Sequence, residues 1–139
     1  MAESDDPTAI RSIAVRGDDL AAALEAEMRS GGDAVLRITP PFSGRMRARL
    51  HVPGDDAYDA PAPIHVGPRE LVDEPPAYPE PAETEDALRA DPDAEYTRER
   101  HRERHQDAVA AWREAVRECV VDEVTLATDD EHRVAVTLL

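Results

Sequence analysis

The residues with the clearest chemical potential are four arginines in a stretch that contains no acidic residue. Arg37, Arg45, Arg47 and Arg49 lie within residues 36–52 of a 139-residue chain whose formal net charge is −15. The stretch carries +4, so the rest of the chain carries −19. A guanidinium group donates forked hydrogen bonds to carboxylates and phosphates. The four arginines therefore predict a binding site for an acidic ligand.

Alternation of side chains predicts how these arginines are presented. In residues 45–52 charged and apolar side chains take turns, which is typical of a β-strand with one buried face. The strand would point Met46, Ala48, Leu50 and Val52 toward a core and Arg45, Arg47, Arg49 and His51 outward. Arg37 joins the outer side if Leu36 and Ile38 face inward. We call this side of the sheet, with Arg37, Arg45, Arg47 and Arg49, the arginine face.

The surroundings of the arginine face suggest what it binds. Ser43 and Gly44, in the turn before the second strand, would offer backbone hydrogen-bond donors at its edge. The predicted ligand is RNA, DNA or an acidic protein. Stacking of single-stranded bases is disfavoured because the chain has only one Phe and one Trp. In the alternative interpretation, the arginines pair with the chain's own acidic segment or form a solvated surface.

Other reactive side chains point to packing rather than catalysis. His101 and His105 stand four residues apart, a spacing that metal ligands use, but neighbouring arginines repel a divalent cation. Trp112 and Cys119 lie on the apolar stripe of the same helix, as a core anchor and a buried thiol. The sequence contains no phosphate-binding loop, nucleophile elbow or dinucleotide fingerprint. We therefore expect no catalytic residue, no cofactor and no metal.

Composition predicts the environment of the protein. The chain has 31 acidic and 16 basic residues, and every basic residue is arginine. Excess carboxylate without lysine is typical of salt-adapted proteins, whose charged surface is screened in a molar-salt cytoplasm. No apolar stretch is long enough to span a bilayer, and the N-terminus is acidic, so we expect a cytoplasmic, halophilic protein without a membrane segment. The single cysteine excludes an internal disulfide.

The periodic segments predict the elements that position the arginines. Strands are expected at residues 10–15, 34–39, 45–52, 123–128 and 132–139, and helices at 18–29 and 93–120. The predicted fold is α+β: a four- to five-stranded, mostly antiparallel sheet with two helices on one face. Each helix leads into a hairpin, so a duplicated α-β-β unit is one explanation.

The domain organisation follows from proline and charge. Residues 1–9 are expected to be an acidic flexible N-terminus, and residues 10–139 a single α+β domain. A long acidic, proline-rich loop interrupts that domain at residues 53–95, with a helical turn near 68–72 and an extended piece at 61–66.

Three hypotheses for function follow. The first is a non-enzymatic binding or adaptor module that works through the arginine face. The second is a self-associating structural protein, which would pair through its long helix or add its C-terminal strand to a neighbouring sheet. The third is an enzyme of unknown type with a site where the sheet meets the acidic loop.

Overall fold

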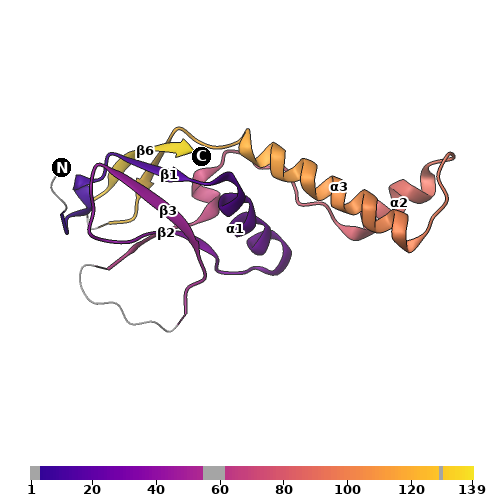
Figure 1. Cartoon of the computed structure of the whole chain (residues 1–139), viewed down its shortest axis with the longest axis horizontal. Coiled ribbons are helices and arrows are strands. Elements are labelled where there is room, and N and C mark those ends of the chain that lie inside the picture. The colour runs from indigo at the N-terminus through magenta and orange to yellow at the C-terminus, as the bar shows by residue number, and fades with distance from the viewer. Residues whose placement is uncertain (1–3, 55–61, 129) are drawn as a thin grey trace.

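The fold is α+β, as expected, but it has more elements than the sequence predicts (Figure 1). The computed structural model describes residues 4–54, 62–128 and 130–139. Within them, six strands form one sheet: β1 (Ser12–Val15), β2 (Val35–Ile38), β3 (Arg45–His51), β4 (Ile64–Val66), β5 (Glu123–Leu126) and β6 (His132–Leu138). The α-helices are α1 (Gly17–Ser30), α2 (Pro81–Ala90) and α3 (Arg98–Arg117), and the 3₁₀ turns are η1 (Pro7–Ala9) and η2 (Pro68–Leu71).

The sheet is mixed, which corrects the expectation of a mostly antiparallel sheet of four or five strands. Its order is β4-β2-β3-β1-β6-β5. Strand β1 lies between the two predicted hairpins and pairs in parallel with both β3 and β6, while the other pairings are antiparallel. Strand β6 pairs with β5 through residues 132–135 and with β1 through residues 135–138, so addition of the C-terminal strand to a neighbouring sheet stays a prediction.

The core lies between the sheet and α1. Apolar residues recur on one side of α1 at helical spacing, and this side is buried through Leu20, Ala21, Ala23 and Leu24. They meet the inward side chains of β1 and β2, where Ile13, Val15, Leu36 and Ile38 are at most 1% exposed. The side of the sheet that faces α1 is therefore the dry side, and the opposite side is left for the charged residues.

The end of α1 depends on one glycine. Gly31 adopts a left-handed backbone conformation with φ 64°, and its N–H donates to the carbonyls of Ala26 and Glu27. A Cβ atom at this position would meet no atom within 4 Å, so the cost of a substitution comes only from the left-handed backbone conformation. Gly31→Ala should therefore lower the free energy of unfolding by about 1 kcal/mol. Gly31→Asn should cost less, because asparagine tolerates this conformation. Urea unfolding measures both, and an alanine variant as stable as wild type would contradict this account.

The acidic loop and the N-terminus both contain more structure than the sequence predicts. The acidic segment contains β4, η2 and α2; the predicted turn near 68–72 and the extended piece at 61–66 correspond to η2 and β4, whereas α2 was not expected. Residues 55–61 of this segment lie outside the described residues. In the predicted flexible N-terminus, Ser4 forms a β-bridge with Phe42, and the Asp6 side chain caps η1. Residues 4–9 are thus held against the domain.

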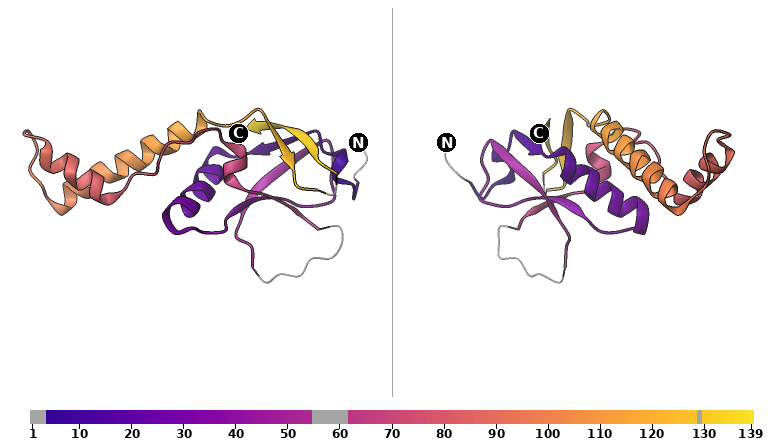
Figure 2. Two further views of the ribbon diagram at one scale, coloured as in Figure 1. Left: turned by 180° about the vertical axis from the view of Figure 1, so that it is seen from behind. Right: turned by 45° about the vertical axis from the view of Figure 1, so that its right-hand side comes forward.

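Helices α2 and α3 form an arm that leads away from the sheet (Figures 1 and 2). This corrects the prediction of two helices on one sheet face, because α3 packs against α1 and α2. At the base of the arm, Arg113 pairs with Glu25 of α1 at 3.1 Å, and Arg117 pairs with Asp18 at 3.0 Å. Helix α3 begins after the cap residue Thr97, and only Trp112 and Val116 among its residues are buried.

Candidate anion-binding face

The strand registers bring the four predicted arginines to one side of the sheet. Arg37 of β2 lies directly opposite Arg49 of β3, while Arg47 and Arg45 follow along β3. The side chains of Arg45, Arg47 and Arg49 are exposed, whereas Ala48 between them is only 1% exposed on the core side. The predicted orientation of β3 is therefore confirmed. Leu50 and Val52, both expected to be buried, are 41% and 69% exposed, so the core ends at Ala48 on this strand.

Small side chains lie beside the arginine row. In β1, Ser12 is the partner of Arg45 and Ala14 is the partner of Arg47. The same two residues face Ala135 and Thr137 of β6 on their other side. The side chains of this strip, which consists of Ser12, Ala14, Ala135 and Thr137, are short. A broad ligand can therefore lie across the strip and reach the guanidinium groups.

The arginine row lacks carboxylate partners. In the described part of the chain, no ion pair or hydrogen bond engages the side chains of Arg45, Arg47 and Arg49, although eight ion pairs form elsewhere. Arg37 differs, because its guanidinium lies 3.3 Å from the Thr39 hydroxyl and 3.3 Å from His51 Nε2. In the described residues, the guanidinium groups of Arg45, Arg47 and Arg49 thus have donors available for a ligand.

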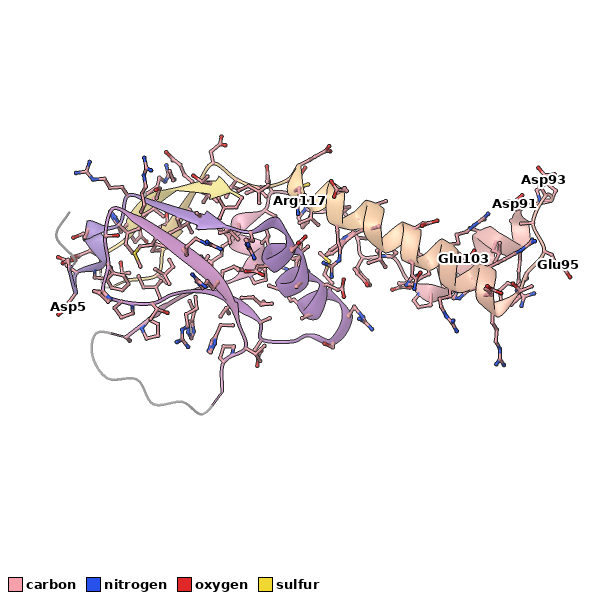
Figure 3. All side chains as sticks on the ribbon, in the orientation of Figure 1. Asp5, Asp91, Asp93, Glu95, Glu103 and Arg117 are labelled. Atoms are coloured by element: carbon pink, nitrogen blue, oxygen red, sulfur yellow. The ribbon has the colours of Figure 1, made fainter. Side chains whose placement is uncertain are left out.

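The described acidic segment does not cover the face. Residues 62–71 continue the sheet edge as β4 and then pack against α1 as η2, and residues 81–90 belong to the arm. Asp91, Asp93 and Glu95 lie at the far end of the arm, away from the sheet (Figure 3). The structure therefore shows no pairing of the arginine row with residues 62–95. The predicted pairing with residues 55–61 falls outside the described residues.

Two histidines continue the face beyond the arginines. His65 of β4 lies beside Arg37, and the ring centroids of His65 and His51 are 5.5 Å apart. The sequence predicted His51 but not His65, because a three-residue strand gives a weak periodic signal. Burial lowers the pKa of His65 below 6.5, and the nearby charges of His51 and Arg37 lower it further.

Comparison with known proteins places the chain in a family. Residues 1–139 match the family model DUF8009, a domain of unknown function. The chain belongs to the DUF8009 family. No curated protein and no solved structure matches it.

The lowered pKa of His65 predicts how the stability of the DUF8009 chain depends on pH. In the folded state the ring resists protonation, whereas in the unfolded chain it takes a proton as the pH falls through about 6.5. The lowered pKa of His65 therefore leaves the free energy of unfolding unchanged above about pH 6.5 and reduces it as the pH falls below that value. Urea unfolding at pH 7.5 and 5.5 should show a larger loss for wild type than for His65→Gln. Equal losses in the two proteins would contradict the assignment.

Several polar groups of the turn before β3 form hydrogen bonds within the protein. The Ser43 N–H donates to Met46 Sδ at 3.4 Å, and its hydroxyl donates to the Arg45 carbonyl at 3.1 Å. The carbonyl of Gly44 accepts from the N–H groups of Arg11 and Ser12 at 2.9 Å. Both residues lie at the edge of the arginine face, but the Ser43 N–H, the Ser43 hydroxyl and the Gly44 carbonyl already have hydrogen-bond partners within the protein. Ligand binding by Ser43 and Gly44 stays a prediction.

The remaining candidates serve the arm. His101 Nε2 lies 2.9 Å from the Pro81 carbonyl, and His105 Nδ1 lies 2.9 Å from the Thr84 hydroxyl, so both histidines join α3 to α2. The Cys119 thiol is half-buried, with Sγ 3.3 Å from the Ala115 carbonyl. Among the described residues no cluster of three or more His, Cys, Asp or Glu side chains is arranged to hold a metal.

Two further features of the described residues bear on binding. A groove of about 640 Å³ is lined by the C-terminal end of α1, the start of α2 and His105 of α3; because both Arg29 and Glu80 line it, it does not gather charge of one sign. No helix in the described ranges is long and apolar enough to cross a membrane.

Proposed function

We propose that this DUF8009 chain is a non-enzymatic binding module of a salt-adapted cytoplasm and that its arginine face holds an acidic ligand. The observation that carries the proposal is the row of exposed arginines on β3, which has no carboxylate partner in the described residues. In the described residues seven arginines form ion pairs with carboxylates, whereas Arg45, Arg47 and Arg49 follow one another along one strand face without such a pair.

The arrangement of the arginines has an energetic cost that an anion removes. Arg37 and Arg49 are cross-strand neighbours, and like charges in this position destabilise a sheet. Arg45, Arg47 and Arg49 add charge along one edge of the same array. An anion that bridges two guanidinium groups replaces this repulsion with charge-assisted hydrogen bonds.

Arginine suits binding in concentrated salt better than lysine does. At about 1 M salt the screening length is about 3 Å, so attraction between distant charges is lost. A guanidinium still forms two parallel hydrogen bonds to one carboxylate or phosphate at contact distance. Guanidinium groups on this face can therefore bind a ligand through short, forked contacts in concentrated salt.

A charge-removal experiment tests the proposal. In about 1 M KCl, labelled polyphosphate and labelled poly-glutamate serve as generic polyanions in fluorescence anisotropy titrations. The triple variant Arg45→Gln, Arg47→Gln, Arg49→Gln should bind the better of the two at least about tenfold more weakly, equal to about 1.4 kcal/mol. The matched control is Arg98→Gln, Arg100→Gln, Arg102→Gln, which removes the same charge from exposed positions on α3. It should change the affinity less than about twofold.

Two results would overturn this function. If neither polyanion binds to the wild-type chain, the face is a solvated surface. If both triple variants weaken binding equally, net charge and not the arginine face determines affinity. Circular dichroism establishes that each variant is folded, which is expected because all six arginines are exposed.

A further inference from the structure

We infer that the acidic ligand of the arginine face is the phosphodiester backbone of a nucleic acid, bound without reading of the bases. The inference rests on the proposed function and specifies its ligand. Three features support it: the spacing of the arginines, the small neutral side chains of the neighbouring strip and the charge of the rest of the chain.

The guanidinium groups form a regular array. Alternate residues on a strand are about 6.7 Å apart, and neighbouring strands are about 4.8 Å apart. Arg45, Arg47 and Arg49 thus make a straight row, with Arg37 beside one end of it. A regular row of donors fits a ligand whose anionic groups also recur at regular intervals along a line, and each phosphate can accept a fork from one arginine.

The neutral residues of the face favour a nucleic-acid backbone over an acidic protein. Protein interfaces depend on buried aromatic and apolar anchors at their centre. The strip beside the arginine row instead consists of Ser12, Ala14, Ala135 and Thr137. Its two hydroxyl groups are of the kind that contact phosphate and sugar oxygens. The strip offers a phosphate backbone additional donors and offers a protein partner no anchor.

The same residues exclude recognition of bases by stacking. Single-stranded binding proteins stack bases on aromatic rings. The strand positions on the arginine face carry no Phe, Tyr or Trp, since Phe42 and Trp112 are at most 4% exposed in the core. The contacts are therefore with the backbone, and binding should not depend on base sequence.

The charge of the remaining chain predicts an unusual salt dependence. Ordinary nucleic-acid binding through four phosphate contacts loses about 10³-fold or more in affinity over a tenfold rise in salt, because counterions are released. Here the rest of the chain carries −19 and repels the ligand at low salt. Added salt screens this repulsion, while the forked contacts persist at short range. The two effects oppose each other, so the affinity should change less than about tenfold between 0.2 and 2 M KCl.

The test compares ligands and salt concentrations with the full-length chain. Labelled duplex DNA, duplex RNA and single-stranded DNA of about 30 nucleotides, together with polyphosphate and poly-glutamate, are titrated in about 0.2 and 2 M KCl. At least one nucleic acid should bind more tightly than poly-glutamate, with equal affinity for two unrelated base sequences. The triple variant Arg45→Lys, Arg47→Lys, Arg49→Lys should bind at least tenfold more weakly at 2 M KCl. The lysine version of the α3 control, at Arg98, Arg100 and Arg102, should bind like wild type.

Each result separates the ligand class from the proposed function. Binding of poly-glutamate but of no nucleic acid overturns the inference and leaves the proposed function standing. Preference for polyphosphate over every nucleic acid also overturns it, because the phosphates alone would then be the ligand. Full affinity of the lysine triple variant at 2 M KCl overturns the role of forked contacts. Failure of every polyanion to bind overturns both proposals.

Discussion

Trp112→Ala should lower the free energy of unfolding by about 3–5 kcal/mol, the largest loss expected from any single change considered in this protein. Trp112 is 4% exposed at the base of the arm. Its Nε1–H donates to the Pro76 carbonyl at 2.9 Å, and the ring of Tyr78 meets it edge to face at 4.9 Å. The substitution removes the largest side chain between α3 and the proline-rich segment and leaves a carbonyl without its donor.

Thermal and urea unfolding measure this loss, and Trp112→Phe is the matched control. Phenylalanine keeps an aromatic ring against Tyr78 but cannot donate to Pro76, so it should cost about 1–2 kcal/mol. In a domain of this size the alanine variant should melt roughly 10 °C or more below wild type. A loss below about 1 kcal/mol for alanine would show that the arm is not anchored through this residue.

Lowering the salt concentration should unfold the arm before the sheet. Residues 80–107, which include α2 and half of α3, carry ten carboxylates and five arginines. Helix α2 buries only Thr84 and Leu88, so little apolar surface opposes this repulsion. Arg104 pairs with Asp91 at 3.1 Å, but an exposed pair contributes little. Because dilution from 1 M to about 0.1 M salt lengthens the screening distance from about 3 to about 10 Å, the carboxylates then repel one another across the arm.

Circular dichroism and hydrogen exchange test the salt dependence. Between about 2 M and 0.1 M KCl the melting temperature should fall by roughly 10 °C or more, equivalent to about 2–3 kcal/mol. Amides of α2 should lose protection before those of β1 and β3. The variant Glu83→Gln, Asp86→Asn removes two exposed charges from α2 and should reduce the effect. Unchanged helix content and melting temperature in low salt would contradict the halophilic interpretation.

The sequence predicted those parts of the candidate site that depend on local periodicity. Alternation over residues 45–52 is sufficient to place Arg45, Arg47 and Arg49 on one side of β3, because side-chain direction in a strand repeats every two residues. The same argument, applied to Leu36 and Ile38, turned Arg37 to that side, and the β2–β3 register confirms it. Helix α1 was likewise predicted from its apolar spacing and from Gly31 at its end.

Helix α2 shows where composition misled the prediction. The segment 81–90 has proline in its first turn and Arg89 in its last, both ordinary helix signals. Its carboxylates and the surrounding prolines favoured a long acidic loop without a helix at these residues. Helix α2 becomes stable through Leu88 and Thr84, which pack against α3, and the Thr84–His105 hydrogen bond joins two residues 21 positions apart.

The sequence by itself determined the hairpins, α1 and the outward direction of the arginines, because each depends on residues within one element or its immediate neighbours. Only the tertiary structure decided that β1 separates the two hairpins, that His65 joins the arginine face through β4, and that α3 leaves the sheet as an arm. These features require contacts such as Ser12 with Ala135, which are more than 100 residues apart. Their stability comes from burial and pairing between distant segments, and no periodic pattern within one segment records which distant partner it will meet.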